Sequence, residues 1–445
     1  MKRQGATSNG LRRRVRDLKL ALVGDPRVAA KVDYSLELML TALVVGMVTS
    51  SRSLRKVEQR TGQIAKNPEA GLGIKTRIAD NTFGKLLPRL DPCELVVRLH
   101  GLVKAEHRRG TLKPTVLPVG AVSVDGKNVA TLRWHDLCRV LELDRTKAQP
   151  EEVKALLSQR LPEAQFCVPD HGEPYALVRV HTVTLVSSVA AVCLHQRPIP
   201  GATNEIGAMA DLLTELLAAY GRLHLFEIIT TDAGNTSLGV AGQIATAGLS
   251  YFCQIKVGHR ELYKEAVRAL GSAPDEEAEW TGADTQNGKV VTYRVWQQDL
   301  TDEGWLDWTH ARQLVRVQRT AFDPSTGEVK VGNRYYVSNR NTVQLRPKGC
   351  GELSRRHWRC ENETHWTCDV ELREDRRRLC WSRHPRGVLV AAALRAIALT
   401  ILAVARRLSR LGYSEETPTW DQVSEHFVVV LCRSVLETDD FDADK

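Results

Sequence analysis

Apolar, strand-like runs alternate with helical segments between residues 115 and 258, and no other feature constrains the fold of this chain as strongly. Three strand-like runs come first: one ends at Asp125-Gly126, and the next two meet at Ser187-Ser188. An amphipathic helix at 204–221, a run ending in Asp232, a short helix and a last apolar run follow. This order predicts an α/β protein with a mixed sheet.

The chain changes character on both sides of this core. The N-terminal part is helical and basic, and Asp91 followed by Pro92 marks the start of one of its helices. Residues 275–345 return to strand-like runs separated by polar turns. We predict five units: a helical basic domain (1–112), the first part of the core (113–270), a β-rich insertion (271–350), core helices carrying a glutamate (351–412), and an extension with an acidic, frayed tail (413–445).

Basic residues are clustered rather than spread evenly over the sequence. The formal charge is +9, the first 19 residues hold a run of arginines, and 355–386 hold nine more. Such clusters are typical of a protein with a polyanionic partner, and a solvated basic surface is the alternative. For the helical N-terminal domain, DNA binding and a docking role remain equally open. We expect DNA contacts from two runs of arginine: Arg12, Arg13 and Arg14, and Arg376, Arg377 and Arg378.

The sequence gives no sign of a membrane or secretory protein. The basic N-terminus is followed by polar residues, so it lacks the apolar stretch of a signal peptide. The most apolar stretch, 387–405, is interrupted by Arg395, and we therefore expect a buried core helix. Ten cysteines without a CxxC pair fit reduced thiols in the cytoplasm. Their spacing near 350–380 matches no common zinc site.

Two aspartates, Asp125 and Asp232, stand at the predicted carboxyl ends of apolar strands. Ligand sites in open α/β sheets gather at this edge, although a single strand-end aspartate more often caps a turn. With a third carboxylate on a later helix, the three negative charges would repel one another unless a cation neutralised them. Mg²⁺ is the usual oxygen-preferring candidate, and two such ions about 4 Å apart can act on a phosphodiester.

The third carboxylate comes from HWRCENETHW, residues 357–366. On a regular helix His357, Glu361 and His365 share a face within an arc of about 80°, and Glu363 points about 200° away from Glu361. This geometry favours Glu361 as the ligand and makes Glu363 solvated or paired with arginine. A zinc or iron site made by His357, Glu361 and His365 is a weaker alternative, because it leaves the aspartates unused.

Five motifs, in order along the chain, resemble a known family. They are VSVDGK (122–127), ATNEIGAMADLL (202–213), ITTDAG (229–234), RYYVSN (334–339) and RRHWRCENETHWTCDVELRED (355–375). They look like DDE-type transposases of bacterial insertion sequences, in the group related to the H-repeat-associated proteins of Rhs elements. The last motif is the most specific.

The resemblance implies an RNase H-like core with a β-rich insertion ahead of the catalytic glutamate. It implies a metal-binding triad of Asp125, Asp232 and Glu361 that holds two Mg²⁺ ions, with Mn²⁺ as a substitute. The activity implied is strand cleavage at transposon ends, followed by transfer of the freed 3′-hydroxyl. The partners implied are double-stranded DNA of terminal inverted repeats and target sites, and a second copy of the chain in a synaptic dimer, in the bacterial cytoplasm at the nucleoid.

Four residues near the triad are candidate phosphate contacts: Lys127, Arg355, Arg356 and His357. The broader superfamily has Tyr, Arg and Lys where this chain has Ser354, His357 and Cys368, so the superfamily's phosphate contacts and hairpin intermediate do not transfer directly. Trp358 and Trp366 either pack against the insertion or stack on a displaced base. A plain RNase H-like nuclease and a non-catalytic DNA-binding descendant are the competing hypotheses.

Overall fold

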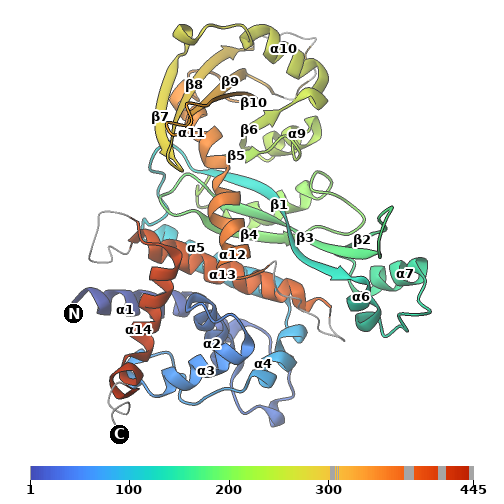
Figure 1. The fold of residues 1–445 in the computed structure, drawn as a ribbon, viewed down its shortest axis with the longest axis vertical. Helices are drawn as coiled ribbons and strands as arrows, with labels where there is room; N and C mark the ends of the chain where they lie inside the picture. Colours follow the sequence, from blue (N-terminus) through green and yellow to red (C-terminus); the bar gives the residue numbers. More distant parts are fainter. Residues whose placement is uncertain are drawn as a thin grey trace.

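The computed structural model describes residues 2–300, 306, 308, 310–374, 385–408 and 417–439. Within this part of the chain, ten strands form one sheet in the order β2-β3-β1-β5-β6-β10-β9-β8-β7, and β4 pairs with β3 beside β2 (Figure 1). The strands are β1 (Ala121–Arg133), β2 (Ala164–Cys167), β3 (Tyr175–Leu185), β4 (Val192–Pro198), β5 (Ile228–Thr231), β6 (Ser250–Ile255), β7 (Trp280–Gln286), β8 (Lys289–Asp299), β9 (Gln313–Phe322) and β10 (Val329–Ser338).

The central strands β1, β5 and β6 run parallel, and their outer neighbours are antiparallel. All four residues of β5 are buried, as expected for a strand covered on both faces. The order β4-β3-β1-β5-β6 is that of an RNase H-like core, so the predicted mixed α/β sheet is confirmed.

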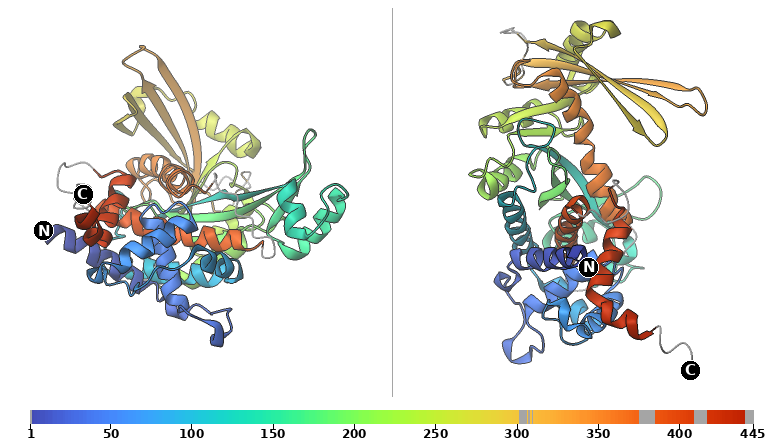
Figure 2. Two further views of the ribbon diagram at one scale, coloured as in Figure 1. Left: turned by 60° about the horizontal axis from the view of Figure 1, so that its bottom comes forward. Right: turned by 90° about the vertical axis from the view of Figure 1, so that its left-hand side faces the viewer.

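The predicted β-rich insertion contributes four strands, β7 to β10, and these extend the core sheet. The link is β10, whose residues Tyr335 to Ser338 pair with Ile255 to Phe252 of β6. The far ends of these strands project away from the rest of the protein (Figure 2). The limits of the five predicted units stay a prediction, but the sheet itself is continuous across the boundary at residue 271.

Helices cover the sheet and build the end of the molecule that lies opposite the insertion. They are α1 (Lys2–Asp17), α2 (Leu36–Val48), α3 (Leu54–Ala65), α4 (Asp80–Leu86), α5 (Pro92–Arg108), α6 (Trp134–Leu141), α7 (Pro150–Arg160), α8 (Met209–Tyr220), α9 (Leu238–Thr246), α10 (Arg260–Leu270), α11 (Pro347–His357), α12 (Trp366–Val370), α13 (Gly387–Leu408) and α14 (Trp420–Asp439). The predicted cap of α5 is confirmed, because the Asp91 side chain accepts a hydrogen bond from the Cys93 amide.

The basic N-terminal helices share their core with the sheet and with the last helices of the chain. One buried cluster contains Leu40 of α2, Leu99 of α5, Val124 of β1, Ile397 of α13 and Phe427 of α14. Helix α13 lies between the N-terminal helices and the sheet, beside α5 and β4 (Figure 1). The helical part of the chain is therefore packed into the structure that carries the sheet. Helix α14 was not expected from the sequence.

Helix α13 is also the apolar stretch that a membrane would require. Of the described helices it is the one long and apolar enough to cross a bilayer, and its apolar window is wholly buried inside the protein. Its Arg395 donates to Glu374 at 3.0 Å, both side chains being buried. The prediction of a buried core helix is confirmed.

Candidate active site

The two aspartates are brought together by the register of the parallel strands β1 and β5. Pairing runs from Ala121 opposite Ile228 to Val124 opposite Thr231, and the next residue on each strand is Asp125 or Asp232. The expectation that Asp125 ends its strand is wrong, because β1 continues to Arg133 through antiparallel pairing with β3. Only β5 ends here, so a mid-strand and a strand-end aspartate lie next to each other.

The turn after β5 fixes both carboxylates through Asn235, a residue that sequence reasoning missed. The Asn235 backbone amide donates to Asp232 Oδ1 at 2.8 Å, and its side-chain amide donates to Asp125 Oδ1 at 3.4 Å. The side chain is buried. The available signal was its place three residues after Asp232, where an aspartate commonly accepts from the backbone.

Glu361 reaches the aspartates from a π-helical turn. The turn, η7 (Cys360–His365), lies between α11 and α12 in a helical segment that runs from the insertion across the middle of the sheet (Figure 1). A π-turn has a wider spacing than the regular helix assumed from the sequence. Glu361 is exposed, whereas His365 is buried with Nδ1 3.6 Å from Asp125 Oδ2.

Both histidines lie against the sheet, but among the described residues His357, Glu361 and His365 do not form a group that could hold a metal ion. His357 is also buried, and its Nδ1 lies at hydrogen-bonding distance from the hydroxyls of Ser123 and Thr230. The arrangement on which the zinc or iron alternative depended is not present in the structure.

The pKa values of the carboxylates reflect their mutual proximity. Burial, followed by the charges of Asp232 and Glu361, raises the pKa of Asp125 to about 7. Burial and Asp232 also raise the pKa of Glu361, against a lowering by Arg334. Neighbouring carboxylates of like charge are the kind of donors that an oxygen-preferring divalent cation neutralises. Among the described residues, however, no three His, Cys, Asp or Glu side chains stand at metal-ligand spacing.

Three predicted DNA contacts lie inside the protein, so the expectation that they contact phosphates is wrong. Lys127 is buried and ion-paired with Asp369 at 2.6 Å, Arg14 is buried against Glu106 at 3.1 Å, and His357 is buried between two strands. A buried cation needs a partner, and these partners are already protein groups. Although burial lowers the pKa of Lys127, nearby carboxylates outweigh it and raise that pKa.

The other predicted contacts differ in their surroundings. Arg355 is ion-paired with Asp284 at 2.6 Å, and Arg356 donates to the Val186 carbonyl at 3.0 Å. In the N-terminal cluster Arg12 donates to the carbonyls of Glu69 and Ala70, and Arg13 is exposed. Arg376, Arg377 and Arg378 lie outside the described residues.

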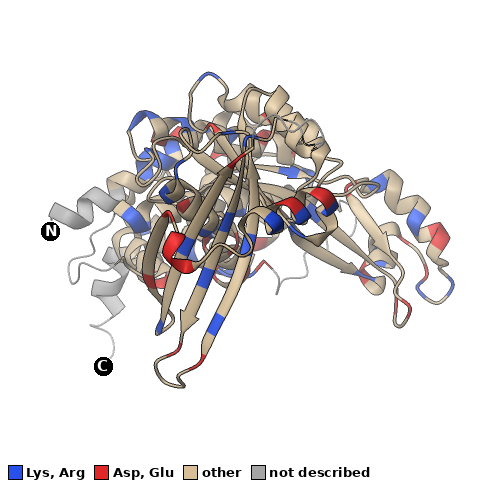
Figure 3. Ribbon diagram, turned by 90° about the horizontal axis from the view of Figure 1, so that it is seen from above, with Lys and Arg blue, Asp and Glu red and all other residues tan. Residues whose placement is uncertain are grey.

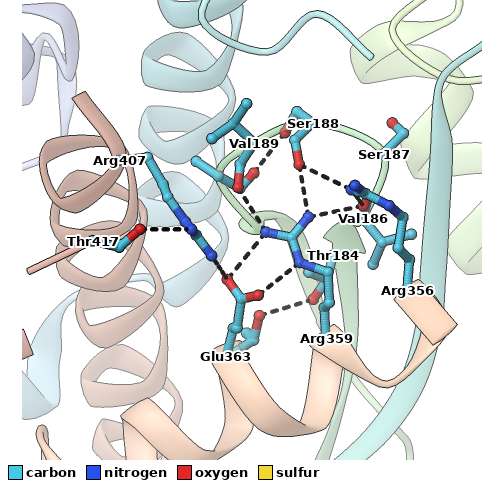
Figure 4. A network of polar contacts seen from close by, with 12 residues as sticks. Thr184, Val186, Ser187, Ser188, Val189, Arg356, Arg359, Glu363, Arg407 and Thr417 are labelled. Carbon is cyan, nitrogen blue, oxygen red and sulfur yellow. Dashed lines mark hydrogen bonds and ion pairs between the residues drawn. The ribbon is translucent and has the colours of Figure 1, made fainter. Parts of the chain in front are cut away.

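Glu363 points away from the aspartates and is paired with arginine, as predicted. Its carboxylate accepts from Arg359 Nε at 2.7 Å and lies 3.6 Å from Arg407 (Figure 4). Arg359 also donates to the carbonyls of Val186, Ser188 and Val189 in the loop after β3. This network fastens the outer side of the π-turn to the sheet and to α13.

Beside the π-turn lies an arginine groove, made by two adjoining cavities of about 660 and 630 Å³ that share Gln286, Asn362, Glu363 and Arg407. Three carboxylates and seven arginines line it, the latter being Arg319, Arg334, Arg355, Arg356, Arg359, Arg406 and Arg407. Basic residues also lie along the long strands that project in Figure 3. The charge of the groove is positive, which suits a polyanion.

Two tryptophans add flat apolar surface to the arginine groove. The Arg334 guanidinium lies over the Trp358 ring, 4.5 Å from its centroid, and Trp366 is 47% exposed. Arg319, Arg334 and Arg407 were not identified from the sequence, because they are scattered over strands and a helix that only the fold brings together.

Comparison with known proteins places this site in a family. A model of the transposase DDE domain matches residues 169–401, which include Asp232 and Glu361 and begin after Asp125. The chain belongs to the DDE transposase domain family. Its RNase H-like mixed sheet and its helical N-terminal part agree with that assignment.

Two Escherichia coli K12 proteins are similar to this chain over half of its length. They are YbfL and YhhI, the second of which bears the name "H repeat-associated putative transposase". Each is 25% identical over 231 residues, which cover 50% of this chain and 58% of the relative. The chain thus spans less than two thirds of these relatives. The resemblance to H-repeat-associated transposases predicted from the motifs is confirmed.

Proposed function

We propose that this transposase binds the terminal inverted repeats of its element and catalyses Mg²⁺-dependent DNA strand cleavage and strand transfer. The observation that carries the proposal is the strand register that sets Asp125 beside Asp232, together with the raised pKa values of Asp125 and Glu361 beside like charges. These three residues come from positions far apart in the sequence, and a structural role does not require like charges to converge.

The carboxylates of Asp125, Asp232 and Glu361 would hold two Mg²⁺ ions. Mn²⁺ has the same preference for oxygen and would substitute. The ions supply activation of the attacking oxygen and neutralisation of the leaving oxygen. Asn235 holds the two aspartates in place through its backbone and side-chain amides. The Asp125 side chain is 17% exposed, so it lies partly inside the protein and can still be reached from solvent.

The arginine groove supports a path for the DNA strand next to this centre. Arg334 lines the groove, and its charge also lowers the pKa of Glu361, so the groove lies near this carboxylate. Arginine side chains can bind DNA phosphates whatever the base sequence, and tryptophan rings can stack on an unpaired base. The groove would therefore bind the DNA backbone beside the scissile bond.

The partners proposed are double-stranded DNA and a second copy of the chain, assembled in a synaptic complex in the bacterial cytoplasm. One assay tests the reaction. The protein is incubated with duplex oligonucleotides ending in the inverted repeats that flank its gene, a supercoiled target plasmid, and Mg²⁺ or Mn²⁺. We expect nicking at the repeat ends followed by joining to the plasmid.

The matched control is Asp125→Asn, which keeps the shape of the side chain and removes its charge. It is expected to bind the duplex and neither nick nor join it. Cleavage without joining would support an RNase H-like nuclease instead. Binding without cleavage by the unsubstituted protein would support a non-catalytic DNA-binding role.

A further inference from the structure

His357 sits between the helical segment that carries Glu361 and the two strands that carry the aspartates. Its Nδ1 is 2.9 Å from Thr230 Oγ1 and 3.1 Å from Ser123 Oγ. All three side chains are buried, with exposures of 5%, 1% and 0% for His357, Thr230 and Ser123. The ring therefore joins one residue of α11 to two strands at once.

The two hydroxyls belong to the same cross-strand row of the sheet. Ser123 of β1 lies opposite Thr230 of β5 in the parallel register. Each comes two residues before an aspartate, and residues two apart in a strand point to the same face. The hydroxyls and the carboxylates of Asp125 and Asp232 thus form consecutive rows on one face of the sheet.

The position of His357 in the helical segment matters for the same reason. Glu361 follows four residues later, about one helical turn further along the segment. A contact that fixes His357 against the hydroxyl row therefore fixes the height at which Glu361 stands above the aspartates. The π-turn begins between the two residues, at Cys360, so Glu361 is its second residue.

Simple packing explains this arrangement poorly. A leucine at 357 and apolar residues at 123 and 230 could fill the same space without any buried polar atom in need of a partner. A histidine here requires matching hydroxyls, and both strands provide one. Hydrogen bonds fix distance and direction, whereas an apolar contact lets a helix slide by fractions of an ångström. The three residues form a joint that sets the register of the helix on the strands.

We propose that His357 is a positioning residue of the metal centre, which acts through Ser123 and Thr230 to hold Glu361 at the distance from Asp125 and Asp232 that two divalent ions require. This role rests on the proposed function, because it concerns the same three carboxylates. It assigns His357 to the support of the ligands and not to the DNA backbone. Residues that orient metal ligands typically change metal affinity or activity 10–100-fold when replaced.

The test compares four variants: His357→Leu, His357→Asn, the double variant Ser123→Ala/Thr230→Val, and the triple variant that adds His357→Leu to it. Asparagine places an amide where Nδ1 lies and can keep a hydrogen bond to the strands. Thr400→Val is the matched control, since it removes a buried hydrogen bond between α13 and the Cys193 carbonyl of β4, away from the carboxylates. Mn²⁺ binding is measured by calorimetry without DNA, the cleavage rate is measured against Mg²⁺ concentration, and thermal unfolding is followed for each protein.

We expect His357→Leu and the double variant to weaken Mn²⁺ binding and to slow cleavage at limiting Mg²⁺ by roughly 10-fold or more. The triple variant should lose no more Mn²⁺ affinity or cleavage rate than His357→Leu or the double variant, because each of these already breaks the contact between His357 and the hydroxyls. His357→Asn should recover most of the loss, and Thr400→Val should match the unsubstituted protein. Wild-type Mn²⁺ binding in the double variant, or no recovery in His357→Asn, would overturn the positioning role.

The outcomes also separate this inference from the proposed function. If the unsubstituted protein binds Mn²⁺ and cleaves no DNA, the proposed strand-transfer function is rejected. The positioning role of His357 is then still decided by the Mn²⁺ affinities of the variants. If the unsubstituted protein binds no Mn²⁺, both fail. If His357→Leu does not fold, the double variant, which leaves the ring in place, decides the question.

Discussion

Asp125 and Asp232 are the first residues beyond the parallel pairing of β1 and β5, so the register of two strands sets them side by side. The consequence is electrostatic as well as geometric. Each carboxylate is held near another of the same charge by backbone hydrogen bonding that the fold needs for its own stability. The sheet thus holds the two carboxylates together against their mutual repulsion, and this repulsion lowers the free energy of unfolding.

The first prediction concerns the stability of Asp125→Asn as a function of pH in metal-free buffer. Folding raises the pKa of Asp125 from an ordinary value of 3.8 to about 7. Between these values the folded protein keeps a proton that the unfolded chain has lost, so stability from this group falls as pH rises and is lowest above pH 7. Asparagine removes the effect. Relative to the unsubstituted protein, Asp125→Asn should gain little free energy of unfolding near pH 4 and on the order of 1–4 kcal/mol above pH 7.

Denaturant unfolding at pH 4.5, 6 and 8 in the presence of a chelator measures this gain. A constant difference between the two proteins across these pH values would contradict the interpretation. Excess Mg²⁺ at pH 8 should stabilise the unsubstituted protein and leave Asp125→Asn unchanged, because a bound ion favours the ionised carboxylates.

The second prediction separates folding from DNA binding at Lys127. Its ammonium group contacts Asp369 at 2.6 Å and Glu374 at 3.4 Å, and Glu374 is almost fully buried. Lys127→Met leaves Glu374 with Arg395 alone and should lower the free energy of unfolding by about 3 kcal/mol. DNA affinity, measured below the unfolding transition, should stay the same. A large loss of affinity at unchanged stability would restore Lys127 as a phosphate contact.

The third prediction tests the arginine groove through salt dependence. Each phosphate contact that is removed should lower the slope of log affinity against log salt concentration by about 1. Arg319→Ala and Arg334→Ala should each weaken binding to duplexes of any sequence and reduce this slope. Arg145, which is half-exposed and paired with Glu173 outside the groove, provides the control. Equal slopes for all three variants and the unsubstituted protein would place the DNA elsewhere.

The sequence was informative where a local pattern is sufficient. The alternation of strands and helices predicted the mixed sheet, Asp91-Pro92 predicted the start of α5, and the motifs predicted the family. The sequence pattern wrongly ended strand β1 at Asp125. The length of β1 depends on its pairing with β3, which the local pattern does not reveal.

The surroundings of the site were harder to predict for a related reason. A regular helical period was assumed for 357–366, and the π-turn from Cys360 to His365 was not expected from the sequence. Lys127 and His357 were taken for surface residues because the partners that surround them lie more than a hundred positions away in the chain. Charge and residue type alone do not distinguish a buried ion pair from an exposed phosphate contact.

The most direct test of the central claim compares Glu361→Gln with Glu363→Gln in the end-cleavage assay with Mg²⁺. The two residues are near neighbours on one π-turn, and only Glu361 faces the aspartates, while Glu363 is bound by Arg359. We predict that Glu361→Gln lowers the cleavage rate at least about 1,000-fold with DNA binding intact, since an ion ligand is lost. Glu363→Gln should keep most of its activity. Retained cleavage in Glu361→Gln would contradict the account.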